Sequence, residues 1–539
     1  MRFIKKYYSL IFSSIFLVVL FSVIYKECIS VTGGKFIYIL DDAYIHMAFA
    51  KNISLNSVFG ITPFEHSSSS SSLLWSLLLV MSFSAFGIND FIPLILNMIL
   101  SFLILGMLFY IFKKFQMSGF SILISLLTVI IITPLTLNVF TGMEHILHAL
   151  FAIPFIFLSV HFLINQKKNM SASNKICFYL YALSALTASV RYESLLLIII
   201  ISVLHLFQKK YYTAFFIVIS GIIPLTIFGL ISLKTGGSFL PNSVLLKAFT
   251  QDSSTFISGL SAKNDLLVYL QMNRKILFLL VLSVFMFLLQ VKLQGNFMSE
   301  IPLLLLIVIV LISVQKIFFS LSFFRYDTYL VITAVSVNAV AVNNYITEGF
   351  GLNLKNSLNF YKNLFIAGSV IYSAFLVYKV SENTKIPAAS RNIYEQQYQM
   401  SEFIKKYYPA DEIALNDIGV VNYYNDIYCT DLIGIGNNGI TSERLSSVLD
   451  KNRIGEITES GKVKIAILYD SWFVKSGGLP DNWYKAGEWT IQDNFICGDD
   501  KVTFYAVETN EKERLITNLK LYSEELPFSV IQTGAYREE

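Results

Sequence analysis

Residues 300–319 read EIPLLLLIVIVLISVQKIFF, an apolar stretch long enough to cross a bilayer as one helix. A helix of about 20 residues is about 30 Å long and therefore matches the hydrocarbon thickness of a membrane. Similar stretches recur along the chain, so we predict a polytopic α-helical protein with about eleven transmembrane helices. The other predicted spans are 8–26, 91–112, 119–138, 146–164, 212–233, 326–345, 363–380, two short helices within 177–207, and a shorter span at 276–290.

The composition of the whole chain favours the same class of protein. Of its 539 residues, 55% are hydrophobic and 14% are charged, and the mean hydropathy is +0.60. One soluble core cannot bury so large an apolar surplus, so a membrane must cover part of it. The sequence lacks a basic patch interleaved with aromatic residues, which argues against a nucleic-acid partner.

Charge divides the chain into two predicted domains. Residues 1–384 carry 25 Lys and Arg against 13 Asp and Glu, whereas residues 385–539 carry 16 against 24. We therefore predict a membrane body over 1–384 and an acidic, soluble α/β domain over 385–539. In the second domain, 391–407 has helical apolar spacing and 463–468 has the pattern of a buried strand. Whether Cys429 and Cys497 form a disulfide there stays open.

The orientation depends on residues 73–86, whose 14 residues are short for a crossing and suit an interfacial helix. If this segment does not cross, the lysines all fall on one side, which the positive-inside rule makes cytoplasmic. Those lysines are Lys5, Lys6, Lys113, Lys114, Lys167, Lys168, Lys209, Lys210 and Lys292. This favoured threading places a large first loop (27–90) and the acidic domain on the outer face. Residues 67–72 are six consecutive serines, a low-complexity run that predicts a flexible loop tip.

The first outer loop carries the strongest candidates for chemistry. Asp41 and Asp42 are adjacent carboxylates beside a bilayer, where charge is costly. They favour a site in which one carboxylate accepts a proton from a hydroxyl and the other orients it. The alternative is a helix cap in a solvated loop. Tyr44, His46 and Glu65 follow in the same loop and are candidate binding residues.

Two further pairs of polar residues lie on the predicted outer face. Glu144 and His145 stand at a turn between helices, where they either bind hydroxyl groups or serve as end residues of a helix. Arg191 and Glu193 interrupt an apolar stretch. Charges in such a place either face a cavity or pair with each other.

Three cationic or amide side chains are candidates for binding a lipid head group. Asn242 and Lys247 follow a glycine-bearing turn, and Arg325 stands at the outer start of a span. A guanidinium can hold a phosphate bidentately, although Arg325 can instead extend to the interface. The histidines lack metal-ligand spacing, and phosphate-binding glycine loops are missing from the sequence, so we predict neither a metal nor a bound cofactor.

The order of six short motifs resembles that of the GT-C glycosyltransferases related to cell-wall arabinofuranosyltransferases. The motifs are Asp41-Asp42-Ala43-Tyr44-Ile45, the stretch from Ser67 to Trp75, Thr141-Gly142-Met143-Glu144, Arg191-Tyr192-Glu193, Leu240-Pro241-Asn242 and Asn416-Asp417-Ile418-Gly419. Two departures stand out, because relatives place a proline before the acidic residue that corresponds to Glu193 and before the Leu-Trp pair at 74–75.

The resemblance implies a GT-C fold and an inverting sugar transfer from a polyprenyl-phosphate donor to a cell-envelope glycan or glycolipid. Asp41 or Asp42 would be the general base, and Arg325, with Arg191 or Lys247, would stabilise the departing phosphate. Asp417 would border the acceptor path, or the second domain would have a purely structural role. The expected location is a bacterial plasma membrane with the active site and second domain on the outer face. A lipid or sugar transporter, or a non-catalytic envelope scaffold, remains an alternative.

Overall fold

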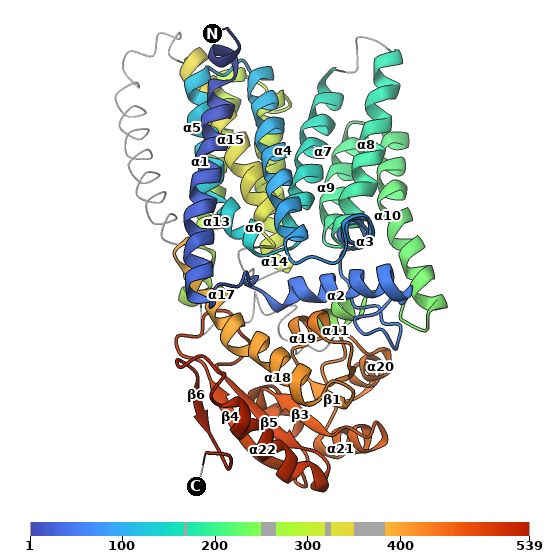
Figure 1. Cartoon of the computed structure of the whole chain (residues 1–539). Helices are drawn as coiled ribbons and strands as arrows, with labels where there is room; N and C mark the ends of the chain where they lie inside the picture. Colours follow the sequence, from blue (N-terminus) through green and yellow to red (C-terminus); the bar gives the residue numbers. More distant parts are fainter. Residues whose placement is uncertain (1, 166–169, 250–265, 319–324, 350–382, 538–539) are drawn as a thin grey trace.

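The computed structural model describes residues 2–165, 170–249, 266–318, 325–349 and 383–537. A body of long, roughly parallel helices stands on a mixed domain with one sheet (Figure 1). The body helices are α1 (Arg2–Val31), α4 (Ile92–Lys114), α5 (Gly119–Ile132), α6 (Leu135–Phe140), α7 (His145–Asn165), α8 (Met170–Val190), α9 (Ser194–Phe207), α10 (Tyr211–Lys234), α13 (Leu266–Gln294), α14 (Glu300–Phe318) and α15 (Thr328–Gly349).

Among the described residues, seven helices are long and apolar enough to cross a membrane, namely α1, α4, α7, α10, α13, α14 and α15. The chain is therefore a multi-pass membrane protein, as predicted, although the number eleven is not confirmed. The predicted span 363–380 lies outside the described residues. Large apolar side chains such as Tyr110, Phe207 and Phe216 are exposed on the body helices, as lipid-facing side chains are.

Two of the apolar stretches in the body are interrupted, one by charged residues and one by a proline. Residues 177–207 form two helices that meet at Arg191–Glu193, as predicted. The prediction of one span at 119–138 is wrong, because α5 ends at Ile132 and α6 begins at Leu135. Pro134 lies between them and cannot continue a helix, since it lacks an N–H group and its ring clashes with the preceding turn.

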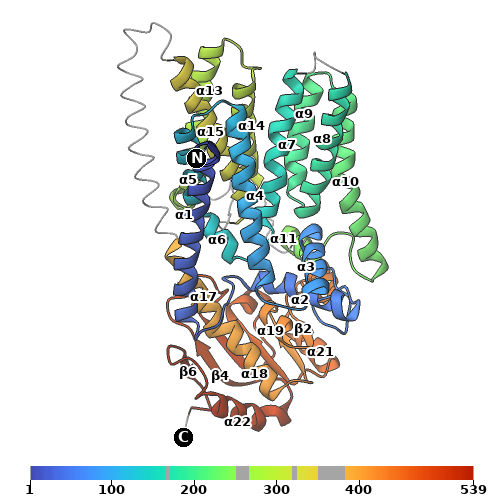
Figure 2. The same cartoon turned by 45° about the horizontal axis from the view of Figure 1, so that its top comes forward.

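Three shorter helices lie between the body and the sheet domain, namely α2 (Asp41–Asn56), α3 (Leu73–Phe86) and α11 (Asn242–Phe249). Figures 1 and 2 show α2 lying across the ends of the long helices and α3 at the same end of the body. The segment 73–86 therefore forms a separate short helix at one end of the body. The N-terminus and Lys114, at the end of α4, lie at the opposite end, where Tyr7 packs on Phe109.

The second domain contains a six-stranded sheet in the order β2-β1-β3-β5-β4-β6, in which β1 pairs in parallel with β2 and β3, and the other pairs are antiparallel. The strands are β1 (Glu412–Leu415), β2 (Tyr428–Asp431), β3 (Ile465–Leu468), β4 (Tyr484–Thr490), β5 (Lys501–Ala506) and β6 (Ile531–Thr533). The helices are α17 (Lys385–Ile393), the π-helical turn η1 (Tyr394–Tyr398), α18 (Gln399–Tyr407), α19 (Gly419–Tyr424), α20 (Asn438–Ser446), α21 (Lys451–Ser460) and α22 (Lys512–Tyr522), with short 3-10 turns η2 (Asp470–Ser476) and η3 (Thr509–Glu511).

The strand predicted at 463–468 is β3, whose four residues are all buried. The helix predicted at 391–407 corresponds to the end of α17, η1 and α18. Cys429 and Cys497 are both free thiols in the structure.

Candidate active site

Asp41 and Asp42 begin helix α2, but their side chains serve different partners. Carboxylates in a first helical turn are favoured by the partial positive charge of the helix N-terminus. Successive residues of a helix point about 100° apart. Asp41 consequently faces the second domain and is only 8% exposed, whereas the Asp42 side chain is 39% exposed and faces Arg325.

The Asp41 carboxylate holds the second domain against the body. It accepts hydrogen bonds from the backbone N–H groups of Gly419 at 2.6 Å and Val420 at 2.7 Å. A Cβ atom at position 419 would lie 2.2 Å from the Asp41 backbone oxygen, so a glycine is required for this close approach. Asp41 is therefore a docking residue in this structure, and both of its oxygens are already engaged.

Asp417 lies beside Asp41 and forms a coupled carboxyl pair with it. Burial raises the pKa of the Asp41 carboxyl well above its usual range, and the charge of Asp417 raises it further. Burial also raises the pKa of Asp417, which accepts hydrogen bonds from Gln397 at 2.7 Å and from the Tyr469 hydroxyl at 3.1 Å. Two buried carboxyls this close retain a proton between them.

We expect asparagine to have opposite effects at these two positions. Asp41→Asn turns an amide N–H toward a backbone N–H and should cost about 1–3 kcal/mol of stability. Asp417→Asn supplies an N–H group to Asp41 in place of the shared proton. Because the folded pKa is raised, the wild-type pair loses stability as pH rises through that pKa. Asp417→Asn should therefore be relatively more stable than the wild type at pH 8 than at pH 5 in thermal denaturation, and equal pH profiles would contradict the shared proton.

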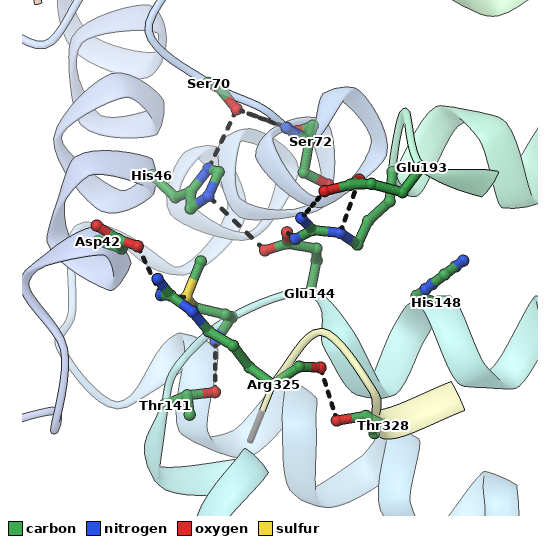
Figure 3. Close-up of polar contacts among 12 residues, drawn as sticks. Asp42, His46, Ser70, Ser72, Thr141, Glu144, His148, Glu193, Arg325 and Thr328 are labelled. Atoms are coloured by element: carbon green, nitrogen blue, oxygen red, sulfur yellow. Dashed lines mark hydrogen bonds and ion pairs between the residues drawn. The ribbon is translucent and has the colours of Figure 1, made fainter. Parts of the chain in front are cut away.

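Asp42, in the first turn of α2, forms an ion pair with Arg325 (Figure 3). Its Oδ2 lies 2.5 Å from Nη1 of Arg325, and the same Nη1 lies 3.1 Å from the sulfur of Met143. Arg325 precedes α15, whereas Asp42 lies on α2, so residues 283 positions apart in the sequence meet here. The structure thus joins two residues that the sequence proposed for one site.

Glu144, Arg191 and Glu193 form a second charged cluster. Glu144 is fully buried, and its Oε1 pairs with Nη1 of Arg191. The same guanidinium donates to both oxygens of Glu193, at 3.2 and 2.6 Å. The mutual pairing of Arg191 and Glu193 is therefore present, and Glu144 completes it. Glu193 remains 37% exposed, so the cluster reaches solvent on one side.

Tyr326 connects the two charged clusters. Its ring centroid lies 4.8 Å from the Arg191 guanidinium and 5.1 Å from that of Arg325. His145 packs edge-on to the same ring, with centroids 5.7 Å apart. Two guanidinium groups, each paired with carboxylates, therefore share one aromatic ring. Tyr326 was not among the residues selected from the sequence, although it adjoins Arg325.

His46 and the serine run lie behind Glu144. His46 Nδ1 is 3.1 Å from the Ser70 hydroxyl, and Nε2 is 3.7 Å from Glu144 Oε2. Ser70 also contacts Ser76 at 2.6 Å. The prediction of a flexible tip at 67–72 is wrong, because five of the six serines are buried. Hydrogen bonds among their hydroxyls and to His46 allow close packing, and Ser70 is a site residue that sequence reasoning missed.

A cavity of about 110 Å³ lies beside Arg325, between the end of the body and α17. Arg325 and Lys385 contribute positive charge, while Leu137, Ile386 and other apolar residues form most of the remaining wall. This combination suits an anionic head group attached to an apolar chain. Among the residues that the structure describes, no group of three or more His, Cys, Asp and Glu side chains is placed to hold a metal ion.

Two solved structures have a similar fold. The chain is similar to ArnT from Cupriavidus metallidurans bound to undecaprenyl phosphate, with a TM-score of 0.51 and 12% identity over 92% of this chain and 98% of that chain. The apo state of the same protein gives a TM-score of 0.52 at 11% identity with the same coverage. The chain has the GT-C fold. This confirms the fold class that the motif order predicted.

The remaining comparisons give weaker matches. The oligosaccharyltransferase AglB from Archaeoglobus fulgidus, in complex with an inhibitory peptide and a dolichol-phosphate, has a TM-score of 0.44 at 11% identity, over 98% of this chain and 76% of that chain. Residues 391–505 match a domain of unknown function, DUF8728. No curated protein matches the chain by sequence.

The structure also places predicted site residues that were not named in the two charged clusters. Tyr44 is buried between Tyr38, Tyr423 and Tyr424, and the last two belong to α19. The side chain of Lys247 lies outside the described residues.

Glu65 and Asn242 are brought together by the residues at the start of α20. Glu65 accepts a hydrogen bond from Asn437 at 3.0 Å, and burial raises the pKa of its carboxyl to about 7. Asn242 donates to Asn438 at 2.9 Å. These two residues therefore connect the body to the second domain.

Proposed function

We propose that the chain is a membrane glycosyltransferase that moves a sugar from a polyprenyl-phosphate donor to a hydroxyl of a cell-envelope glycan or glycolipid. The ion pair between Asp42 and Arg325 carries this proposal. A half-exposed carboxylate and a phosphate-binding cation are held together beside a cavity with apolar walls. ArnT, which shares the fold, binds undecaprenyl phosphate. The lipid-linked donor and the acceptor are the two substrates in this proposal, and no cofactor is needed.

Donor binding would activate the base. In the structure Arg325 neutralises Asp42. A donor phosphate competes for that guanidinium, because an Arg–phosphate contact can be bidentate. Asp42 can then accept the proton of the acceptor hydroxyl as the hydroxyl oxygen attacks the anomeric carbon. The bond from that carbon to the phosphate oxygen breaks, and the phosphate leaves with the electron pair, so the configuration inverts without a covalent enzyme intermediate.

Arg191 would share the stabilisation of the departing phosphate. Its contact with Tyr326 places it next to Arg325, and its pairing with Glu144 and Glu193 fixes the guanidinium. A fixed charge stabilises developing negative charge without reorganising during the reaction. His46 and Ser70 would position Glu144 and have no direct part in the chemistry.

The proposed location is a bacterial plasma membrane with the site on the periplasmic side. Lys113 and Lys114 end helix α4, and Lys209 and Lys210 follow helix α9. Both helix ends lie at the end of the body away from the sheet domain (Figure 1). Positively charged loops favour the cytoplasmic side. We assign residues 1–384 to the membrane body and 385–539 to a periplasmic domain. Asn242 and the loop near Asp417 would border the acceptor path.

Replacing Arg325 tests donor recognition. Arg325→Met removes a charge-assisted contact worth about 1.5–3 kcal/mol, so we expect the donor KM to rise about 10- to 100-fold. The measurement is sugar transfer from a defined polyprenyl-phosphate-linked sugar to a membrane glycolipid extract by the purified full-length protein. Arg453→Met is the matched control, because the ion pairs of Arg453 with Glu443 and Glu456 lie within the second domain. An unchanged donor KM in Arg325→Met would remove Arg325 from the site.

A further inference from the structure

A second cavity, of about 270 Å³, lies apart from the charged clusters, between the end of α1 and the second domain. Lys35 lines it from the loop after α1, Tyr394 and Tyr398 from η1, Glu402 from α18, and Tyr522 from α22. The mechanism proposed above uses none of these residues. Because Lys35 follows the last residue of a membrane-spanning helix by four positions, the cavity opens close to the bilayer surface.

Two of the tyrosines that line this cavity belong to a π-helical turn. π-helical turns widen a helix and are frequent at functional sites. Here the turn aligns Tyr394 and Tyr398, whose rings stack with centroids 5.6 Å apart. It also turns Gln396 and Gln397 inward, where both contact the Tyr469 hydroxyl. One short segment thus supports the sheet domain and presents aromatic rings to the cavity.

The polar groups of the cavity carry both signs of charge. Lys35 donates a hydrogen bond to the Tyr398 hydroxyl and lies 4.5 Å from the centroid of its ring. Lys406 pairs with Glu525, and Lys405 and Glu402 also line the wall. The wall carries three lysines and two glutamates, so a phosphate would meet both signs of charge and leave the glutamates unsatisfied. An acyl chain would leave the ammonium and hydroxyl groups unsatisfied.

A sugar satisfies these groups better than either alternative. Each sugar hydroxyl both donates and accepts hydrogen bonds, so it can bond to carboxylates, ammonium groups and tyrosine hydroxyls alike. The apolar face of a sugar ring can pack on a tyrosine ring. The volume of about 270 Å³ lies just below the range for ligand pockets, about 300–1,000 Å³, and therefore suits a ligand of one or two sugar residues.

We propose that this tyrosine-lined cavity is a saccharide-binding site that holds the glycan part of the acceptor while the acceptor's reactive hydroxyl reaches Asp42. The assignment of the glycan to an acceptor rests on the proposed glycosyltransferase function. Binding of a saccharide at the cavity does not rest on it. The position near the bilayer suits a glycan that is anchored in the outer leaflet by a lipid.

The test uses purified full-length protein and three named disaccharides, maltose, cellobiose and N,N′-diacetylchitobiose, in saturation-transfer NMR. Two variants alter the cavity: Tyr394→Ala removes a stacking face, and Glu402→Gln/Lys405→Gln changes side chains at the cavity wall without removing a large core group. Lys451→Gln/Asp481→Asn is the control, because it breaks an exposed ion pair of the same domain outside the cavity. Thermal denaturation confirms that each variant is folded.

We expect at least one disaccharide to bind, and both cavity variants to weaken that binding about tenfold, equivalent to about 1.4 kcal/mol. The control variant should bind like the wild type. Absence of binding by all three sugars, equal binding in the cavity variants, or displacement of the sugar by inorganic phosphate would overturn the site.

Transfer kinetics separate the site from the proposed function. In the membrane-extract assay, Glu402→Gln/Lys405→Gln should raise the acceptor KM about tenfold and leave the donor KM unchanged. An unchanged acceptor KM in an active enzyme would refute the acceptor assignment. Cavity-dependent saccharide binding by a wild-type protein that transfers no sugar would refute the glycosyltransferase function and leave the saccharide site standing.

Discussion

Asp42→Asn should reduce sugar transfer by about 10²- to 10⁴-fold and leave the protein folded. An asparagine keeps the shape of the side chain but cannot accept the acceptor's proton, and general-base catalysis contributes about that factor. The asparagine oxygen can still accept a hydrogen bond from Arg325, whose side chain is 14% exposed, so the variant should fold, with some loss of stability from the missing charge. The measurement is the initial rate of transfer by the purified protein, together with its thermal denaturation temperature.

Asp481→Asn is the matched control for this variant, because Asp481 is an 82% exposed aspartate that also pairs with a cation, Lys451. Its transfer rate should stay within about twofold of the wild type. Retention of full activity by Asp42→Asn would refute the assignment of the base. A folded Asp41→Asn protein with the larger loss of rate would move that role to Asp41.

Arg191→Met should give the largest loss of stability among the site variants. It leaves the fully buried Glu144 without its cation, and breaking a buried ion pair from one side costs about 3–5 kcal/mol. Glu193 tolerates the change better, since it is partly exposed. The measurement is the free energy of unfolding in detergent, with transfer activity recorded on the fraction that remains folded.

The double variant Arg191→Met/Glu144→Gln separates stability from chemistry. With both charges removed, most of the stability should return, because the glutamine that replaces Glu144 carries no uncompensated charge. Transfer should remain low, because the guanidinium that stabilises the departing phosphate is still missing. Recovery of full activity would show that Arg191 has only a structural role.

The transmembrane helices could be predicted because a bilayer imposes a simple rule on the sequence. A helix in hydrocarbon satisfies its own backbone and needs about 20 apolar residues, so stretches such as 300–319 identify themselves. Charge in such a stretch is costly, which is why Arg191 and Glu193 marked the break between α8 and α9. Pro134 also indicates a break after α5, but the predicted span ran through it because the residues around this proline are apolar.

The site was predictable in part for the same reason. Polar residues between or at the ends of apolar stretches, such as Asp42, Glu144, Arg191 and Arg325, stand out from their surroundings. In the structure Arg191 and Arg325 contact Tyr326, and Glu144 and Asp42 pair with these two arginines. Other residues gave no such signal. The serine run looked like a loop tip, because the sequence does not show that Ser70 has His46 as a partner.

The sequence by itself determined that the chain crosses a membrane many times and that charged residues lie where its apolar stretches end or break, because both follow from the cost of exposing polar groups to hydrocarbon. Only the tertiary structure decided between the adjacent carboxylates. Asp41 is held by Gly419 and Val420, which lie 378 and 379 positions away in the sequence, while Asp42 meets Arg325. Long-range contacts of this kind depend on how the two domains pack, and local sequence does not encode that packing.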